Sequence, residues 1–176
     1  AQLVSGLRDL VPMVGNLTLV FGILVCLAAV KSPVLSSPAQ AKSEEDKRAR
    51  QLESERKKLD RTKDPADRAE SLMKIADITL SYVAEAAKAN DQPMTAHYLD
   101  QYRDAVSGAR DTMMNSGLDP YKKPKGYQTV ELAIRKHLRI LGDTAQTLTP
   151  EQRKPVDAVI DTASKIREEF LRALFR

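Results

Sequence analysis

The chain has 176 residues, of which 42% are hydrophobic and 30% charged, with 7 glycines and no tryptophan; this composition is ordinary for a folded domain and favours helices over a β-rich fold. The formal net charge is +4, and the basic residues are interleaved with acidic ones, which does not indicate a nucleic-acid-binding protein. A single cysteine, Cys26, excludes an intramolecular disulfide framework and a cysteine-rich zinc site.

Residues 1–41 have the layout of a secretory signal peptide. No charged residue occurs in 10–30, and a turn-prone stretch then leads to Ala39-Gln40-Ala41, whose small side chains suit a signal peptidase. We therefore predict cleavage after Ala41 and a periplasmic or extracellular mature protein. A retained transmembrane anchor is the main alternative, because 21 uncharged residues can span a bilayer core of about 30 Å. A third interpretation is that this apolar run forms a buried helix of a cytosolic domain.

Residues 42–63 are predicted to form a charged helical lead-in. Acidic residues precede basic ones by four positions, the favourable order on a helix, in the pairs Glu44–Arg48, Asp46–Arg50 and Glu53–Lys57. The apolar stripe of this segment is thin, which favours a solvated helix over a stalk or a partner-binding helix.

Residues 64–176 are predicted to form a helical bundle domain around a long hairpin at 65–116. Asp64-Pro65 is a helix start, Asn90-Asp91 is a break, and Gly117 can adopt the left-handed conformation that ends a helix. Between these points apolar residues recur every three or four positions, as on one face of a helix. Because the break is short, the two helices are expected to run antiparallel.

The segment 117–126 contains two prolines and two glycines and is predicted to be an irregular connector. Three lysines in it lie between two tyrosines, and basic residues beside aromatic rings can contact an anion or an anionic polymer. The candidate contact residues are Lys122, Lys123, Lys125, Tyr121 and Tyr127. A solvated connector is the alternative interpretation.

Two further helices are predicted, at 127–148 and from Thr149 to near the last residue. Gly142 weakens the first by up to about 1 kcal/mol relative to alanine, unless a neighbouring helix needs close approach there. Thr149-Pro150-Glu151-Gln152 is a capping-box start. Pro155 follows five residues after Pro150, so we expect a separate or kinked first turn.

Large aliphatic residues on these apolar faces are predicted to share one core, because no single helix can bury its own stripe. Nine residues are placed in it: Leu80, Val83, Leu99, Val106, Ile134, Leu138, Leu141, Ile160 and Ile166.

No motif for catalysis or metal binding stands out. The two histidines, His97 and His137, lie on different predicted helices without a second ligand three or four residues away. Phosphate-binding, nucleophile-elbow and zinc-protease motifs are absent from the sequence. We predict that the protein is not an enzyme and has no metal or other cofactor, with both histidines at the core or its boundary.

One stretch resembles uncharacterised exported all-helical domains of the bacterial envelope. The similarity covers residues 58–114 and is carried by Lys58-Leu59-Asp60, Asp64-Pro65-Ala66-Asp67-Arg68-Ala69 and Lys74-Ile75-Ala76-Asp77. It implies an envelope location, and it supplies no activity or functional residue.

The sequence thus predicts an all-α fold: an antiparallel bundle of about four main helices around the hairpin, preceded by a charged helix and an export or membrane segment. The predicted role is a non-enzymatic structural or protein-interaction module of the envelope. The expected partner is a protein or an envelope polymer, not a nucleic acid, and the membrane is involved only if the N-terminal segment is retained.

Two other roles stay open. One is a small enzyme or ligand carrier with a site inside the bundle, which a large internal cavity with converging polar groups would favour. The other is a membrane-tethered subunit of a larger complex. An exposed apolar patch would instead favour partner binding.

Overall fold

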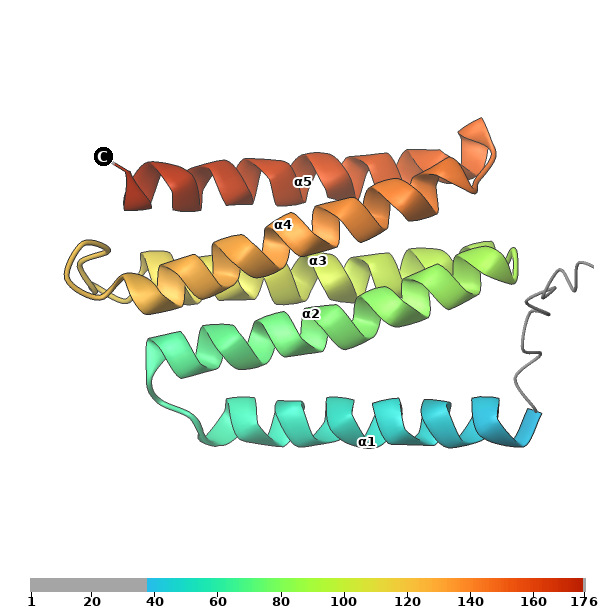
Figure 1. The fold of residues 1–176 in the computed structure, drawn as a ribbon, viewed down its shortest axis with the longest axis horizontal. Coiled ribbons are helices and arrows are strands. Elements are labelled where there is room, and N and C mark those ends of the chain that lie inside the picture. Colours follow the sequence, from blue (N-terminus) through green and yellow to red (C-terminus); the bar gives the residue numbers. More distant parts are fainter. Residues whose placement is uncertain (1–37, 176) are drawn as a thin grey trace, which may run out of the picture. The chain divides into compact units, whose positions relative to one another are not determined.

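The computed structural model describes residues 38–175 as five α-helices with no strand among them (Figure 1). The helices are α1 (Pro38–Arg61), α2 (Pro65–Lys88), α3 (Gln92–Met114), α4 (Pro124–Gln146) and α5 (Pro150–Leu174). The all-α prediction is therefore confirmed for this part of the chain. Most of the predicted signal peptide, including its apolar run, lies outside the described residues. None of the five described helices combines the length and hydrophobicity needed to cross a membrane.

The hairpin of α2 and α3 starts and ends where the sequence predicts. The Asp64 carboxylate accepts a hydrogen bond from the Asp67 backbone N–H at 3.0 Å, and Asp91 accepts one from the Met94 N–H at 3.0 Å. These bonds satisfy first-turn donors that have no partner within their own helix. Gly117, just beyond α3, has a φ of 69° and so takes the left-handed conformation expected of it.

The start of α4 differs from the prediction. This helix begins at Pro124, three residues before Tyr127, so the irregular connector is shorter than 117–126. Proline fits the first helical position because its φ is already helical and its missing N–H would have had no partner there. Pro124 therefore begins the helix.

The first turn of α5 also differs from the prediction. The helix runs through Pro155 as one element, so a separate first turn is wrong, whereas a kinked first turn stays a prediction. Gln152 stabilises the helix start, where its side-chain oxygen accepts a hydrogen bond from the Thr149 N–H at 3.2 Å. Pro155 lies near the N-terminus, so its missing N–H removes only one bond of the helix ladder.

Helices α2 to α5 share one hydrophobic core. α2 packs against α1, α3 and α4, and α5 packs against α3 and α4, which agrees with the broad apolar face of α2 in the sequence. Seven of the nine predicted core residues are buried. The other two, Leu138 and Ile160, are only partly buried and pack against the edge of the core.

α1 lies along α2 and is attached mainly through polar contacts (Figure 1). The Arg48 guanidinium is 2.6 Å from a carboxylate oxygen of Glu85 and lies over the Tyr82 ring, 5.0 Å from its centre. Apolar packing from α1 against the core comes from Leu52 and Leu59, both partly buried. The predicted charged helix with a thin apolar stripe is confirmed as a helix.

Candidate functional site

The three predicted contact lysines gather at the start of α4. Lys122, Lys123 and Lys125 line one open hollow of about 400 Å³, which we call the lysine hollow. Within the described residues, the one carboxylate within ion-pair distance of their nitrogens is that of Asp119, whose oxygen is 4.0 Å from Lys122 Nζ. Asp64 also lines the hollow. Positive charge thus gathers at the helix N-terminus, where the helix dipole is also positive.

Tyr127 does not belong to this surface. It is only 3% exposed, and its hydroxyl lies 3.0 Å from the carbonyl oxygens of both Met113 and Leu118. Its ring packs edge-on against Phe170. Tyr127 therefore holds the connector against α3 and α5, and an aromatic contact from it to a surface ligand is wrong. Tyr121 is exposed, so anion or polymer contact through Tyr121 and the lysines stays a prediction.

Next to the lysine hollow is an apolar cleft of about 350 Å³. Three of the four exposed large hydrophobic residues in the described chain line it: Tyr121 (59% exposed), Leu132 (50%) and Phe175 (80%). They come from the connector, from α4 and from the end of α5, which lie at the same end of the bundle (Figure 1). The cleft is completed by Pro120, Pro124, Gln128, Glu131 and Leu174.

The acidic residue in the cleft wall, Glu131, is neutralised by an ion pair with an arginine of α5. Glu131 is buried, and its Oε1 is 2.8 Å from Nε of Arg167. A buried carboxylate needs such a partner, because leaving it unpaired would cost several kcal/mol. The pair links α4 to α5 beneath the cleft and leaves no uncompensated acidic charge in it.

The exposed face of α4 around the cleft is basic. Residues 119–143 contain six lysines and arginines and three acidic residues, a net charge of +3 within a chain whose total is +4. Glu131, one of those three acids, is buried. Leu132 follows Lys125 by seven residues and precedes Arg135, Lys136 and Arg139 by three, four and seven, so all lie on one side of the helix. We call these four cations the basic face; Leu132 lies in its middle.

A buried polar cluster forms the second candidate. His137 has no exposed surface, and its Nε2 donates a hydrogen bond to Oδ1 of Asp77 at 3.1 Å. Lys136 Nζ donates to the same oxygen at 2.8 Å. Partial burial would raise the pKa of Asp77, but the bonds from His137 and Lys136 outweigh it and lower that pKa from 3.8 to about 2.

Two groups of this cluster are closed off from solvent. Nδ1 of His137 and the hydroxyl of Tyr102 are both buried without a hydrogen-bond partner, and burial raises the pKa of Tyr102. Asp77 reaches an open hollow of about 270 Å³ between α1 and α2, but neither His137 nor Tyr102 lines it. The cluster therefore ties α2 to α4 inside the bundle.

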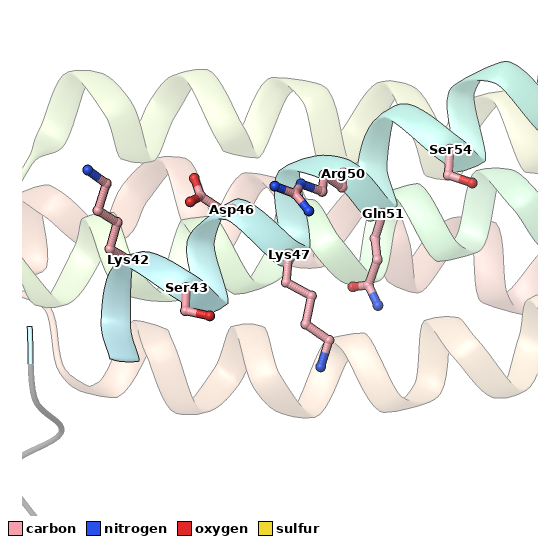
Figure 2. A pocket seen from close by; sticks show the side chains of 7 residues that line it. All are labelled: Lys42, Ser43, Asp46, Lys47, Arg50, Gln51 and Ser54. Atoms are coloured by element: carbon pink, nitrogen blue, oxygen red, sulfur yellow. The ribbon is translucent and has the colours of Figure 1, made fainter. Parts of the chain in front are cut away.

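A larger hollow, of about 640 Å³, lies along the first half of α1 (Figure 2). Its seven lining residues are all polar or charged and all come from this one helix: Lys42, Ser43, Asp46, Lys47, Arg50, Gln51 and Ser54. Figure 2 shows that their side chains point in different directions and do not converge. Without an opposing wall from a second described element, this face is not a built binding site.

The histidines are not brought together. His97, on α3, is exposed and its Nε2 is 2.7 Å from Nε2 of Gln101, whereas His137 is buried on α4. A position at the core or its boundary is therefore confirmed for His137 and wrong for His97. Within residues 38–175, no group of three or more His, Cys, Asp or Glu side chains is arranged to hold a metal ion. Cys26 lies outside that range.

The combination of an apolar cleft and a basic face defines an all-helical protein with an exposed candidate interaction surface. The chain matches no family model, no curated protein and no solved structure with which it was compared. The resemblance to exported envelope domains accordingly stays a prediction.

Sequence reasoning missed Leu132 and Phe175. Leu132 carries a signal in retrospect, since it is a large apolar residue off the buried stripe of α4, and Phe175 is a large apolar residue just beyond the end of α5. Leu132 falls between Val130 and Ile134, which are both buried. A large aliphatic side chain on an otherwise charged helix face is unusual enough to note.

Proposed function

We propose that this chain is a non-enzymatic protein-interaction module that binds a partner through the apolar cleft. The observation that carries the proposal is the gathering of Tyr121, Leu132 and Phe175 around one hollow. Exposed apolar side chains scattered singly need no explanation, but a contiguous group bounded by polar residues is typical of a binding surface. Aromatic residues at a concave site are also the usual anchors of an interface.

The observations favour this role over an enzyme or ligand carrier. The polar cluster around His137 has no exposed imidazole surface, whereas the cleft opens to solvent. An enzyme site requires converging polar groups that a substrate can reach.

The architecture and location that accompany this function are a bundle of four main helices, a charged helix before it, and an export segment at 1–41. The protein would then act in the periplasm or outside the cell, or at the membrane if the segment is retained. Mass spectrometry of protein secreted by a bacterial host should find an N-terminus at Lys42. An intact chain in the membrane fraction would support the tethered alternative.

The interaction is tested by placing a photo-reactive benzoylphenylalanine at one position and irradiating the cells that produce the protein. With the probe at Leu132, we expect a cross-linked product of defined mass, in which sequencing identifies the partner residue. Met94 is the matched control, because it is the one exposed large hydrophobic of the described chain outside the cleft. Equal cross-linking at Leu132 and Met94, or none at Leu132, would contradict the proposal.

A further inference from the structure

We propose that the partner element is an acidic peptide segment carrying a large apolar side chain, with that side chain in the apolar cleft and the acidic groups on the basic face. The inference rests on the proposed function and adds the chemistry of the partner to it.

The concave shape of the cleft favours a partner that inserts a side chain into it. Its volume of about 350 Å³ is at the lower end of the range for sites that hold small organic groups. Tyr121, Leu132 and Phe175 supply apolar walls from three separate elements, so a side chain entering the cleft contacts the connector, α4 and α5 together. Burying such an anchor removes apolar surface from water on both partners.

The positive charge around the cleft favours a partner with acidic residues beside the inserted side chain. Lys125, Arg135 and Arg139 share the side of α4 on which Leu132 lies, and all three are exposed. Among the described residues, no carboxylate lies within ion-pair distance of any of these three cations. Lys122 and Lys123 extend the positive charge to the connector. A partner with acidic residues beside its anchor gains both attraction and orientation from this arrangement.

The concave shape of the cleft favours a peptide over an anionic membrane as the partner. A bilayer accepts side chains that project outward, whereas Leu132 is half buried and is part of the cleft wall. The lining also favours a peptide over single-stranded nucleic acid. Bases stack on exposed ring faces, but two prolines and two leucines line the cleft beside its two aromatic rings.

The test is an unbiased selection of short random peptides displayed on phage against the full chain. Enriched peptides are then measured by fluorescence anisotropy against the wild type, Leu132→Asp and Met94→Asp. We expect Leu132→Asp to weaken binding about tenfold or more, because it places a polar carboxylate in the cleft that repels the acidic groups of the peptide. Met94→Asp should leave binding unchanged. Circular dichroism verifies that both variants, each changed at an exposed position, remain folded.

The composition of the selected peptides tests whether the partner segment is acidic. We expect those that depend on Leu132 to be net acidic with at least one aromatic or large aliphatic residue. Replacing Lys125, Arg135 and Arg139 together by glutamine should then weaken binding and flatten its salt dependence. Leu132-dependent peptides that are neutral or basic would overturn the inference and leave the proposed function standing. No Leu132-dependent peptide at all would count against both.

Two further probes complete the test. Vesicles containing anionic lipid, or a short single-stranded RNA, should bind no more weakly to the uncharged variant Leu132→Asn than to the wild type, because this variant leaves the charge of the basic face unchanged. If either probe binds through Leu132 while no acidic peptide does, the surface serves that ligand and the peptide proposal is wrong.

Discussion

Two glycines on α4 predict opposite outcomes for the same substitution. A Cβ atom at Gly126 would lie 2.7 Å from Cε of Met113 and 3.0 Å from Cβ of Ala66, whereas a Cβ at Gly142 would meet nothing within 4 Å. Alanine at Gly142 gains about 0.5–1 kcal/mol, because glycine loses more backbone freedom in a helix. At Gly126 overpacking costs about 1–3 kcal/mol and outweighs that gain. We expect Gly142→Ala to raise the free energy of unfolding and Gly126→Ala to lower it.

Urea titration followed by helical circular dichroism measures both variants. The midpoint should move in opposite directions at an unchanged slope. The two variants should differ by about 1–3 kcal/mol, the cost of overpacking, because the gain from replacing glycine is common to both. The Gly126 contact is checked with Met113→Ala: because it removes the atom that clashes, the double variant should lose less than the two single losses combined. Equal stability of Gly126→Ala and Gly142→Ala would refute the close approach of α4 to α2 and α3.

Three further outcomes are expected. Asp77→Asn should lower stability at neutral pH by about 1 kcal/mol, a value reduced for a side chain that is 40% exposed. Because the folded-state pKa of Asp77 is depressed, this stabilisation is lost in the wild type as pH falls from about 4 to about 2, so acid titrations of the two proteins should converge there. Leu141→Ala should cost about 2–5 kcal/mol in denaturant titration and Leu138→Ala distinctly less, since only Leu141 is fully buried. Elemental analysis of purified protein should find no stoichiometric metal; one zinc, copper or iron per chain, lost in His137→Ala, would overturn this expectation.

The fold of the described helices could largely be predicted because each signal is local. Capping at Asp64 and Asp91 depends on residues three positions away, and periodic apolar residues define each buried face without knowledge of its neighbour. The errors also have a local cause. Pro124 was placed in an irregular connector and Pro155 was expected to separate or kink the first turn of α5, although proline is well tolerated near a helix N-terminus.

The candidate site was less predictable because it depends on contacts between distant parts of the chain. Lys122 and Tyr121 were identified from their spacing, but that same spacing could not distinguish the exposed Tyr121 from the buried Tyr127. The cleft requires Leu132 on α4 to meet Phe175 after α5, and periodicity in one helix does not reveal which helix packs beside it. The bond between Asp77 and His137 spans 60 positions and left no local signal for the same reason.

The attachment of α1 makes the protein sensitive to its ionic surroundings. Arg48 contributes an ion pair and a ring contact, and among the described side chains of α1 apolar packing against the core comes from Leu52 and Leu59. We therefore expect α1 to open at a lower free energy than the one that unfolds the core. Because dissolved salt weakens the Arg48–Glu85 attraction, we expect it to favour this opening. In the open form Tyr82 would lose its contact with Arg48 and keep its stacking on Tyr98, whose ring centre is 5.1 Å away.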